Sequence, residues 1–261
     1  MKNFNFKSAT NSKEASKLAS GRATFLAGGM SLLPAMKLRL AAYSDLINIK
    51  KIKTLSGIKV SSKSLRIGAT TTHSLVSNSK EVGKSIPSLA VLADGIGDPQ
   101  VRNRGTIGGS IANNDPAADY PSACLALNAT IHTSKRKISA DKFFKGMFET
   151  DLKKGELIES VEFEIPEKSA YAKYPNPASR YAVVGVYVAK LKNEVRVAVT
   201  GAASCVFRSK ELEASLSNNF SASAIDSVNI SNKGLNSDIH ASAEYRAHII
   251  KVMAKKAVSS C

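Results

Sequence analysis

Two glycine-rich turns are the parts of this 261-residue chain whose residue types could bind and position a ligand. The first, residues 27–31, reads Ala-Gly-Gly-Met-Ser, and the second, residues 106–110, reads Thr-Ile-Gly-Gly-Ser. Because glycine has no side chain, the N–H groups of such turns can converge on phosphate oxygens, and the helix start expected beside each adds positive potential. Either turn alone also fits an ordinary chain reversal, whereas two facing turns could clamp both halves of a pyrophosphate.

The familiar templates for catalysis and nucleotide binding do not occur in the chain. Neither G-x-G-x-x-G nor G-x-x-x-x-G-K-[ST] is present, which excludes the Rossmann-type dinucleotide fingerprint and the P-loop. H-E-x-x-H and G-x-S-x-G are also absent, and the four histidines are scattered. We expect His73 to stand at a helix start rather than to bind a metal. With these templates absent, the function that the two glycine turns still favour is the binding of a phosphate-bearing group.

The stretch NNDPAADYP after the second turn adds two carboxylates, Asp115 and Asp119. An Asp–Pro pair favours a turn or a helix cap, so we expect Asp115 to be structural. Asp119 follows four residues later and could face the same way. A carboxylate beside a pyrophosphate must bind hydroxyl groups rather than phosphates, and a ribose or ribityl chain fits that role.

Alternating strands and helices are expected to position the first turn. Strands are predicted at FNFKSAT, RATFLA and LINIKKI. NSKEASKLAS predicts a capped helix with Ala15, Leu18 and Ala19 on one face. Ser31 is predicted to cap the helix that follows the first turn, and Pro34 is tolerated because it falls in the first turn of that helix.

Two further segments follow from about Gly57. A strand and a capped helix are predicted at SLRIGATTTHSLV, and a helix at SIPSLAVLADGIG. A helix and a strand are predicted at SACLALNATIHT, and another strand at LIESVEFEIP. We expect residues 95–121 between them to be irregular and functional. After the Pro-rich IPEKSAYAKYPNPASR, the runs YAVVGVYVAKL and VRVAVTGAAS predict a hairpin, and SAEYRAHIIKVMAKKA predicts a last helix.

Composition narrows the classes of protein that the chain can belong to. The net charge is +16, but the basic residues are spread out and aromatic residues are only 6%, so a nucleic-acid surface with stacking side chains is not expected. The three cysteines, Cys124, Cys205 and Cys261, form no C-x-x-C pair, so the chain cannot build an iron–sulfur or zinc site locally. We expect a protein of the cytoplasm, including the inner face of the membrane, with neither signal peptide nor transmembrane segment.

Three stretches of the chain carry a resemblance to a known family. AGGMSLLPAMKLR, DPQVRNRGTIGGSIANNDPAADYP and NPASRYAVVGV closely resemble the FAD-binding subunit of molybdenum hydroxylases, in particular the medium subunit of the carbon monoxide dehydrogenase type, and the related flavin module of xanthine dehydrogenases. DIHASAEYR is similar to the C-terminal domain of that family. The resemblance covers nearly the whole chain.

This resemblance implies an α+β fold. Residues 1–57 and 58–167 would form the two subdomains of a PCMH-type FAD-binding module, with FAD in the cleft between them. Residues 168–261 would form a small C-terminal domain with a three-stranded antiparallel sheet and helices.

The resemblance also implies cofactor-binding positions. The two turns would contact the FAD diphosphate, Asp119 would bond hydroxyls of the flavin nucleotide, and Tyr181 is an additional candidate that fits equally well as a hairpin aromatic. Met30 stands where a polar residue is more usual and Ser110 where Asn is common, but both keep their backbone donors. The implied positions are Ala27, Gly28, Gly29, Met30, Ser31, Leu32, Leu33, Ile96, Thr106, Ile107, Gly108, Gly109, Ser110, Asp119, Ile158 and Lys173.

By the same resemblance the chain is an electron-transfer subunit with no catalytic side chain and no metal of its own. Its partners would be a small subunit with [2Fe–2S] clusters and a large molybdopterin subunit, assembled as a dimer of heterotrimers. Electrons would leave the FAD for a quinone, NAD or oxygen. Two alternatives stay open: a stand-alone FAD oxidoreductase, and a basic nucleic-acid-binding protein.

Overall fold

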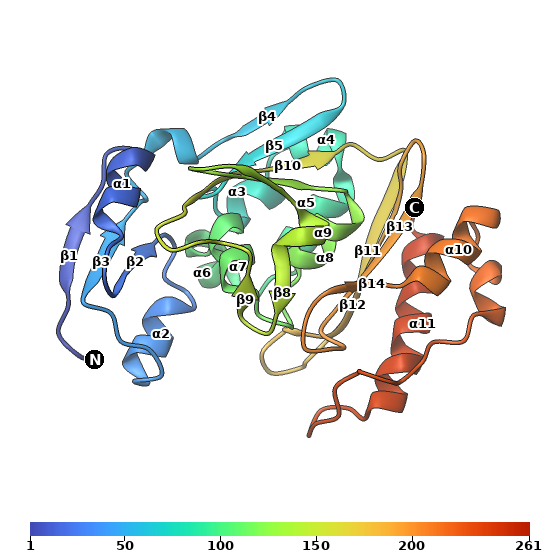
Figure 1. The fold of residues 1–261 in the computed structure, drawn as a ribbon. Helices are drawn as coiled ribbons and strands as arrows, with labels where there is room; N and C mark the ends of the chain where they lie inside the picture. The colour runs from blue at the N-terminus through green and yellow to red at the C-terminus, as the bar shows by residue number, and fades with distance from the viewer.

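The computed structural model describes all residues from 1 to 261, arranged in three consecutive blocks, each built on its own sheet. Figure 1 shows the N-terminal block at one end, the central block in the middle and the C-terminal block at the other end. No helix is both long enough and apolar enough to cross a membrane.

The N-terminal block is a parallel three-stranded sheet in the order β1-β3-β2. Asn11 caps the first helix by accepting a hydrogen bond from the N–H of Glu14 at 2.9 Å. Ser31 stands at the N-cap of the second helix as predicted, but its hydroxyl accepts no hydrogen bond there, so the predicted side-chain cap is wrong. The elements are β1 (Asn5–Ser8), α1 (Ser12–Leu18), β2 (Ala23–Leu26), α2 (Leu32–Lys37), β3 (Asp45–Asn48) and η1 (Lys53–Leu55).

The central block is a five-stranded antiparallel sheet in the order β4-β5-β10-β6-β7, with helices packed on one face. In Figure 1 the helices α3, α5, α7 and α8 lie beneath β5 and β10, where they cover the largest hydrophobic core of the chain. The strands are β4 (Ile58–Val60), β5 (Ser64–Gly68), β6 (Thr130–Thr133), β7 (Lys137–Ser139) and β10 (Ile158–Glu164), with a small hairpin of β8 (Phe144–Gly146) and β9 (Glu149–Thr150). The helices are α3 (His73–Ser77), α4 (Lys80–Ser85), α5 (Pro87–Asp94), α6 (Pro99–Arg104), α7 (Ile107–Asn113), α8 (Tyr120–Ala126) and α9 (Ala140–Phe143).

Residues 95–121 are more regular than predicted, because they contain α6, α7 and the start of α8. Asp98 caps α6 by accepting the N–H of Val101 at 2.8 Å, and Pro99 follows at the first helical position. Thr106 caps α7 by accepting the N–H of Gly109 at 3.2 Å. The high glycine content hid these cap signals, so the prediction of an irregular stretch was wrong.

The C-terminal block contains the three long antiparallel strands that were expected, and a two-residue strand, β14, extends the sheet. The predicted hairpin and last helix are confirmed. The Pro-rich stretch at residues 165–180 contains the whole of β11, whose alternate residues Ala170 and Ala172 are buried in the C-terminal core. The elements are β11 (Lys168–Pro175), β12 (Ala182–Lys190), β13 (Val195–Thr200), β14 (Phe207–Arg208), α10 (Lys210–Asn218), η2 (Ser223–Ser227) and α11 (Ala243–Ser259).

The C-terminal sheet is packed on both faces, which joins it firmly to the central block. One face carries the core shared with α10 and α11, while Tyr187, Ala189 and Ala198 on the other face belong to the central core. Buried Arg246 of α11 donates to the carbonyl oxygens of Val183 and Gly201 at 2.6 and 3.1 Å. Its other amino group pairs with Asp238 at 2.7 Å, so the first acidic residue of the DIHASAEYR stretch is paired with its last residue.

Candidate functional site

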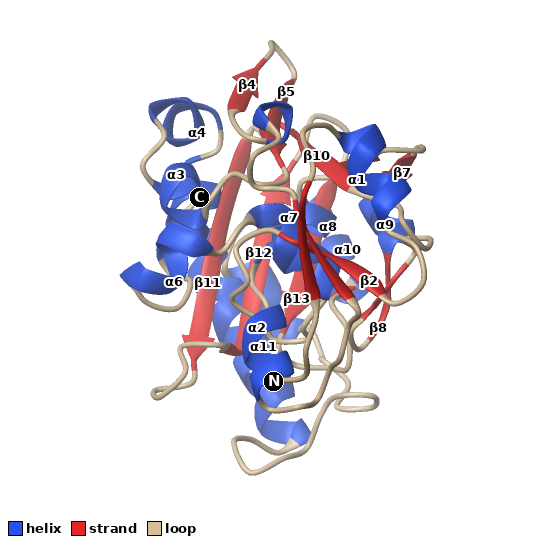
Figure 2. Cartoon of the chain, turned by 90° about the vertical axis from the view of Figure 1, so that its left-hand side faces the viewer, coloured by secondary structure: helices blue, strands red, loops and turns tan.

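A cleft of about 1150 Å³ lies between the N-terminal and central blocks and contains residues from both glycine turns. Figure 2 shows the molecule from the side of the N-terminal block, with α1 and α2 toward the viewer. Ligand sites in proteins commonly have volumes of roughly 300–1,000 Å³, so this cleft is large enough for an extended ligand.

Most of the residues expected at a cofactor site line this cleft. Three of the expected residues do not line it. Ile107 is fully buried, Leu33 packs against Gly29, and the largely buried side chain of Lys173 pairs with Asp119. Tyr181 lines the cleft and is 47% exposed. The expected residues that line it are Ala27, Gly28, Gly29, Met30, Ser31, Leu32, Ile96, Thr106, Gly108, Gly109, Ser110, Asp119 and Ile158.

The first turn offers unpaired donors to the cleft. The backbone N–H groups of residues 28–31 donate to no other group of the protein. Gly29 has a φ of +77°, in the left-handed region that glycine adopts without strain. Successive free N–H groups in such a turn form an anion-binding concavity, so this turn fits a phosphate.

The second turn differs, because the backbone N–H groups of residues 107–110 already donate inside the protein. The N–H of Gly108 bonds the carbonyl oxygen of Ala69 at 2.9 Å, and that of Gly109 bonds the Thr106 hydroxyl. Gly109 itself is exposed, and a Cβ placed on it would come close only to that hydroxyl, at 2.9 Å. This turn therefore offers the cleft an open surface without a side chain rather than a row of free donors.

The two turns meet backbone to backbone. A Cβ on Gly28 would collide with the carbonyl group of Arg104, just before the second turn. A Cβ on Gly108 would lie 2.6 Å from that of Ala69 at the end of β5. The glycines at positions 28 and 108 are thus required by protein packing, which brings the two turns into one wall of the cleft.

Asp119 lies in the cleft wall and is 4% exposed. Its Oδ1 accepts a hydrogen bond from the hydroxyl of Tyr171 and lies 3.0 Å from Nζ of Lys173, whereas its Oδ2 has no partner in the protein. Burial raises the pKa of the carboxyl group, and the charge of Lys173 opposes that shift. Asp115 behaves as predicted, since its carboxylate accepts the N–H of Ala117 at 2.9 Å.

Several residues of the cleft were missed from the sequence. His73 stands at the start of α3, as expected, but it also lines the cleft. Phe148 comes from the tip of the β8–β9 hairpin and Glu156 from the segment before β10, two regions without a glycine motif. Their positions depend on long-range packing, so no local signal marks them.

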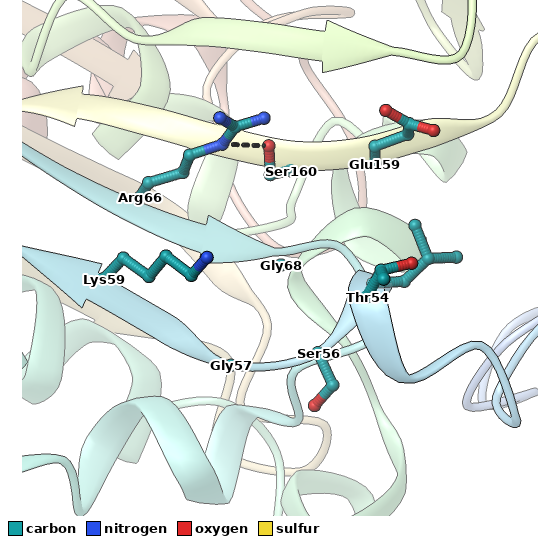
Figure 3. Close-up of a pocket in the computed structure, with 9 residues that line it drawn as sticks. Thr54, Ser56, Gly57, Lys59, Arg66, Gly68, Glu159 and Ser160 are labelled. Atoms are coloured by element: carbon teal, nitrogen blue, oxygen red, sulfur yellow. Dashed lines mark hydrogen bonds between the residues drawn. The ribbon is translucent and has the colours of Figure 1, made fainter. Parts of the chain in front are cut away.

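A second, smaller hollow of about 330 Å³ lies where η1 meets β4, β5 and β10. Figure 3 shows Lys59, Arg66 and Glu159 around it, with Arg66 Nε donating to the Ser160 hydroxyl at 2.7 Å. None of the residues expected at a cofactor site lines this hollow. The 1150 Å³ cleft is therefore the candidate site.

Comparisons with known proteins show the family to which the chain is similar. Residues 2–168 match the family model described as the FAD binding domain in molybdopterin dehydrogenase. The chain is 35% identical over 271 aligned positions to the glyceraldehyde dehydrogenase medium chain of Sulfolobus acidocaldarius, covering 97% of this chain and 96% of the relative. It is 38% identical to the carbon monoxide dehydrogenase medium chain of Hydrogenophaga pseudoflava, covering 71% of this chain and 69% of the relative.

A solved structure has the same overall fold. It is a carbon monoxide dehydrogenase from Hydrogenophaga pseudoflava that lacks the Mo-pyranopterin moiety of the molybdenum cofactor. It aligns with a TM-score of 0.89 at 31% sequence identity, covering 99% of this chain and 96% of the other.

Proposed function

This chain belongs to the family of FAD-binding subunits of molybdopterin dehydrogenases, and from that premise we propose that it carries electrons from the [2Fe–2S] clusters of a partner subunit to an external acceptor. FAD is its cofactor. The observation that carries the proposal is the row of free N–H groups at residues 28–31, in a turn that lines the cleft beside the second turn.

The residues of the cleft divide by the part of FAD that each fits. The N–H groups of residues 28–31 and the open surface of Gly109 would hold the diphosphate, and Oδ2 of Asp119 is free to accept from hydroxyl groups. Ile96, Ile158 and Tyr181 would contact the flavin and exclude water from it. Bound FAD supplies the redox chemistry, while the protein positions the ring and shapes its surroundings.

The clusters are assigned to a partner because this chain has no ligand set for them. Cys124 is buried on α8, Cys205 lies in the loop before β14, and Cys261 is the last residue. Exposed apolar side chains gather at the cleft, where Leu40 and Phe148 are 80% and 59% exposed. We propose that they face an iron–sulfur small subunit, which with a molybdopterin large subunit would complete a dimer of heterotrimers.

Purification of the chain alone and in its complex tests this function. We expect the chain alone to show flavin absorption and no substrate dehydrogenase activity. Adding the cluster and molybdenum subunits should restore turnover with an artificial electron acceptor and reduce the flavin. A lone chain that oxidises substrate at a useful rate would support the stand-alone oxidoreductase, and a flavin that stays oxidised during turnover would contradict the electron route.

A nucleic-acid-binding function is the second alternative, because the net charge of +16 favours anionic partners. Tight, salt-sensitive DNA binding by a purified chain without flavin bands would support it. We place the complex in the cytoplasm, including the inner face of the membrane, and take quinone, NAD and oxygen as the acceptors to be compared.

A further inference from the structure

His73 occupies a fixed position at the wall of the cleft, beside the second glycine turn. It is the first residue of α3, is 5% exposed and lines the cleft. Its N–H donates to the carbonyl oxygen of Gly105 at 3.0 Å, and the preceding Thr72 pairs with Thr106 in a β-bridge. A Cβ on Gly105 would lie 2.6 Å from Nε2 of His73, so the imidazole rests directly on the turn.

The imidazole has unused hydrogen-bonding capacity. Its Nδ1 is buried without a partner, and its Nε2 makes no hydrogen bond within the protein. The ring of Tyr120 packs against it with 5.3 Å between centroids, and the Tyr120 hydroxyl is also buried without a partner. Because Nδ1 and the Tyr120 hydroxyl have no accessible surface, Nε2 is the ring nitrogen that can reach a polar ligand group in the cleft.

The surroundings of His73 keep it neutral while the cleft holds no anion. Burial, and then the charge of Arg102 on α6, lower the pKa of His73 to about 4. Arg102 Nε lies 3.6 Å from the carboxylate of Asp94 on α5. Burial raises the pKa of Tyr120 and Cys124 on α8, so both are neutral. Helix α4 contributes only exposed charged side chains, Lys80, Glu81 and Lys84.

We propose that His73 contacts the diphosphate of the cofactor through Nε2 and that this contact is linked to the uptake of one proton. The proposal rests on the proposed function, because it takes the diphosphate to lie between the two turns. The proton comes from solvent and is held by the imidazole, and no covalent bond is broken. An anion within about 4–6 Å favours the charged form of a histidine, so binding raises the pKa of His73 above its value in the flavin-free chain.

The sign of the pH dependence follows from this shift. A group whose pKa is higher in the complex favours the complex when it is protonated. FAD affinity therefore rises as the pH falls through the bound-state pKa, and it levels off below the free-state value of about 4. Because one pKa unit corresponds to a tenfold change in binding, we expect the dissociation constant to fall about three- to tenfold between roughly pH 8 and 5.5.

Titration of the flavin-free chain with FAD across this pH range tests the proposal, with His73→Gln as the main variant. His132→Gln is the matched control, because His132 is also buried but pairs with Glu162 at 2.7 Å on the central sheet, outside the cleft. We expect the wild type and His132→Gln to bind more tightly at low pH and His73→Gln to show a flat profile. Affinity that does not vary with pH in the wild type, or a slope that survives in His73→Gln, would overturn the proposal.

Two ligand probes separate this proposal from the proposed function. ADP-ribose carries a diphosphate esterified at both ends, as in FAD, but no flavin, and it should show the same pH slope. Riboflavin, which has no phosphate, should show none. Failure of FAD to bind at any pH would instead count against the proposed function. If His73→Gln does not fold, His73→Asn and a proton NMR titration of His73 in the wild type give the same answer, since its pKa must rise when FAD binds.

Discussion

Nζ of Lys173 lies 3.0 Å from Oδ1 of Asp119, and this ion pair joins the first strand of the C-terminal sheet to the wall of the cleft. Lys173 also donates to the carbonyl oxygen of Gly95 at 2.8 Å, and Tyr171 on the same strand donates to Asp119. Both members of the pair are largely buried, with side chains 11% and 5% exposed. The C-terminal block therefore fixes the carboxylate that the proposed cofactor would use.

Replacing Asp119 should reduce both stability and FAD affinity. Asp119→Ala leaves the buried ammonium of Lys173 without its carboxylate, which typically costs about 3–5 kcal/mol of folding stability. Loss of the free Oδ2 should weaken FAD binding by roughly 1–3 kcal/mol. Denaturant unfolding of the flavin-free chain and titration with FAD measure the two effects separately.

The matched control for this pair is Asp115→Ala, which removes a turn hydrogen bond but no ion pair. It should cost about 1 kcal/mol of stability. The double variant Asp119→Leu with Lys173→Met should recover most of the stability but not the affinity, since replacing both ions leaves no unpaired charge. An unchanged dissociation constant in Asp119→Ala would return Asp119 to a purely structural role.

Gly109→Val should prevent FAD retention while leaving most of the fold intact. The position is exposed toward the cleft, and the added methyl groups would fill space where the backbone meets the diphosphate. Flavin absorption of the purified variant, compared with its circular dichroism spectrum, checks this. Gly83→Val on α4 is the control, because nothing lies within 4 Å of a Cβ there. Wild-type flavin content in folded Gly109→Val would contradict the assigned site.

Local patterns predicted most of the elements but only part of the site. The apolar runs of β12 and β13 and the cap at Asn11 depend on residues close in the chain, so the hairpin and α1 could be predicted. The pairing of Gly108 N–H with Ala69 and of Asp119 with Lys173 joins residues far apart in sequence, and no local pattern carries it. For the same reason, the sequence could indicate two glycine turns but not that only the first has a row of free donors.

Glu156 should contribute stability that depends on pH. Its buried carboxylate accepts hydrogen bonds from Arg136 Nε at 3.0 Å, the N–H of Lys153 at 2.8 Å and the Thr133 hydroxyl at 2.7 Å. Burial alone would raise its pKa, but these bonds outweigh burial and hold the pKa below the ordinary value of 4.5. A lowered carboxyl pKa contributes stability above the unfolded-state value, and that contribution is lost as the pH falls through the folded-state value.

Glu156→Gln should accordingly lower the stability of the flavin-free chain by about 1–3 kcal/mol at neutral pH. The difference from the wild type should shrink as the pH falls below 4.5. Chemical unfolding at a series of pH values measures it. Glu159→Gln is the control, because that side chain lies at the smaller hollow and makes no hydrogen bond to the residues around it (Figure 3). A difference that stays constant down to acid pH would show that the ionised carboxylate is not the stabilising form.

Leu40→Ser and Phe148→Ser should weaken assembly without removing FAD. Both side chains are mostly exposed at the cleft, on the α2–β3 connection and the β8–β9 hairpin, so each leaves apolar surface that a partner subunit could cover. Because a buried aromatic or aliphatic anchor often contributes more than about 2 kcal/mol to an interface, each variant should lower the affinity for the cluster-bearing subunit at least tenfold.

Val91→Ser on α5 is the control, since Val91 is 64% exposed but lies outside the cleft. Co-purification of the subunits, together with the flavin content of this chain, measures assembly and cofactor binding separately. Full assembly by both cleft variants would place the partner on another face, whereas loss of FAD with unchanged assembly would assign the two side chains to the cofactor.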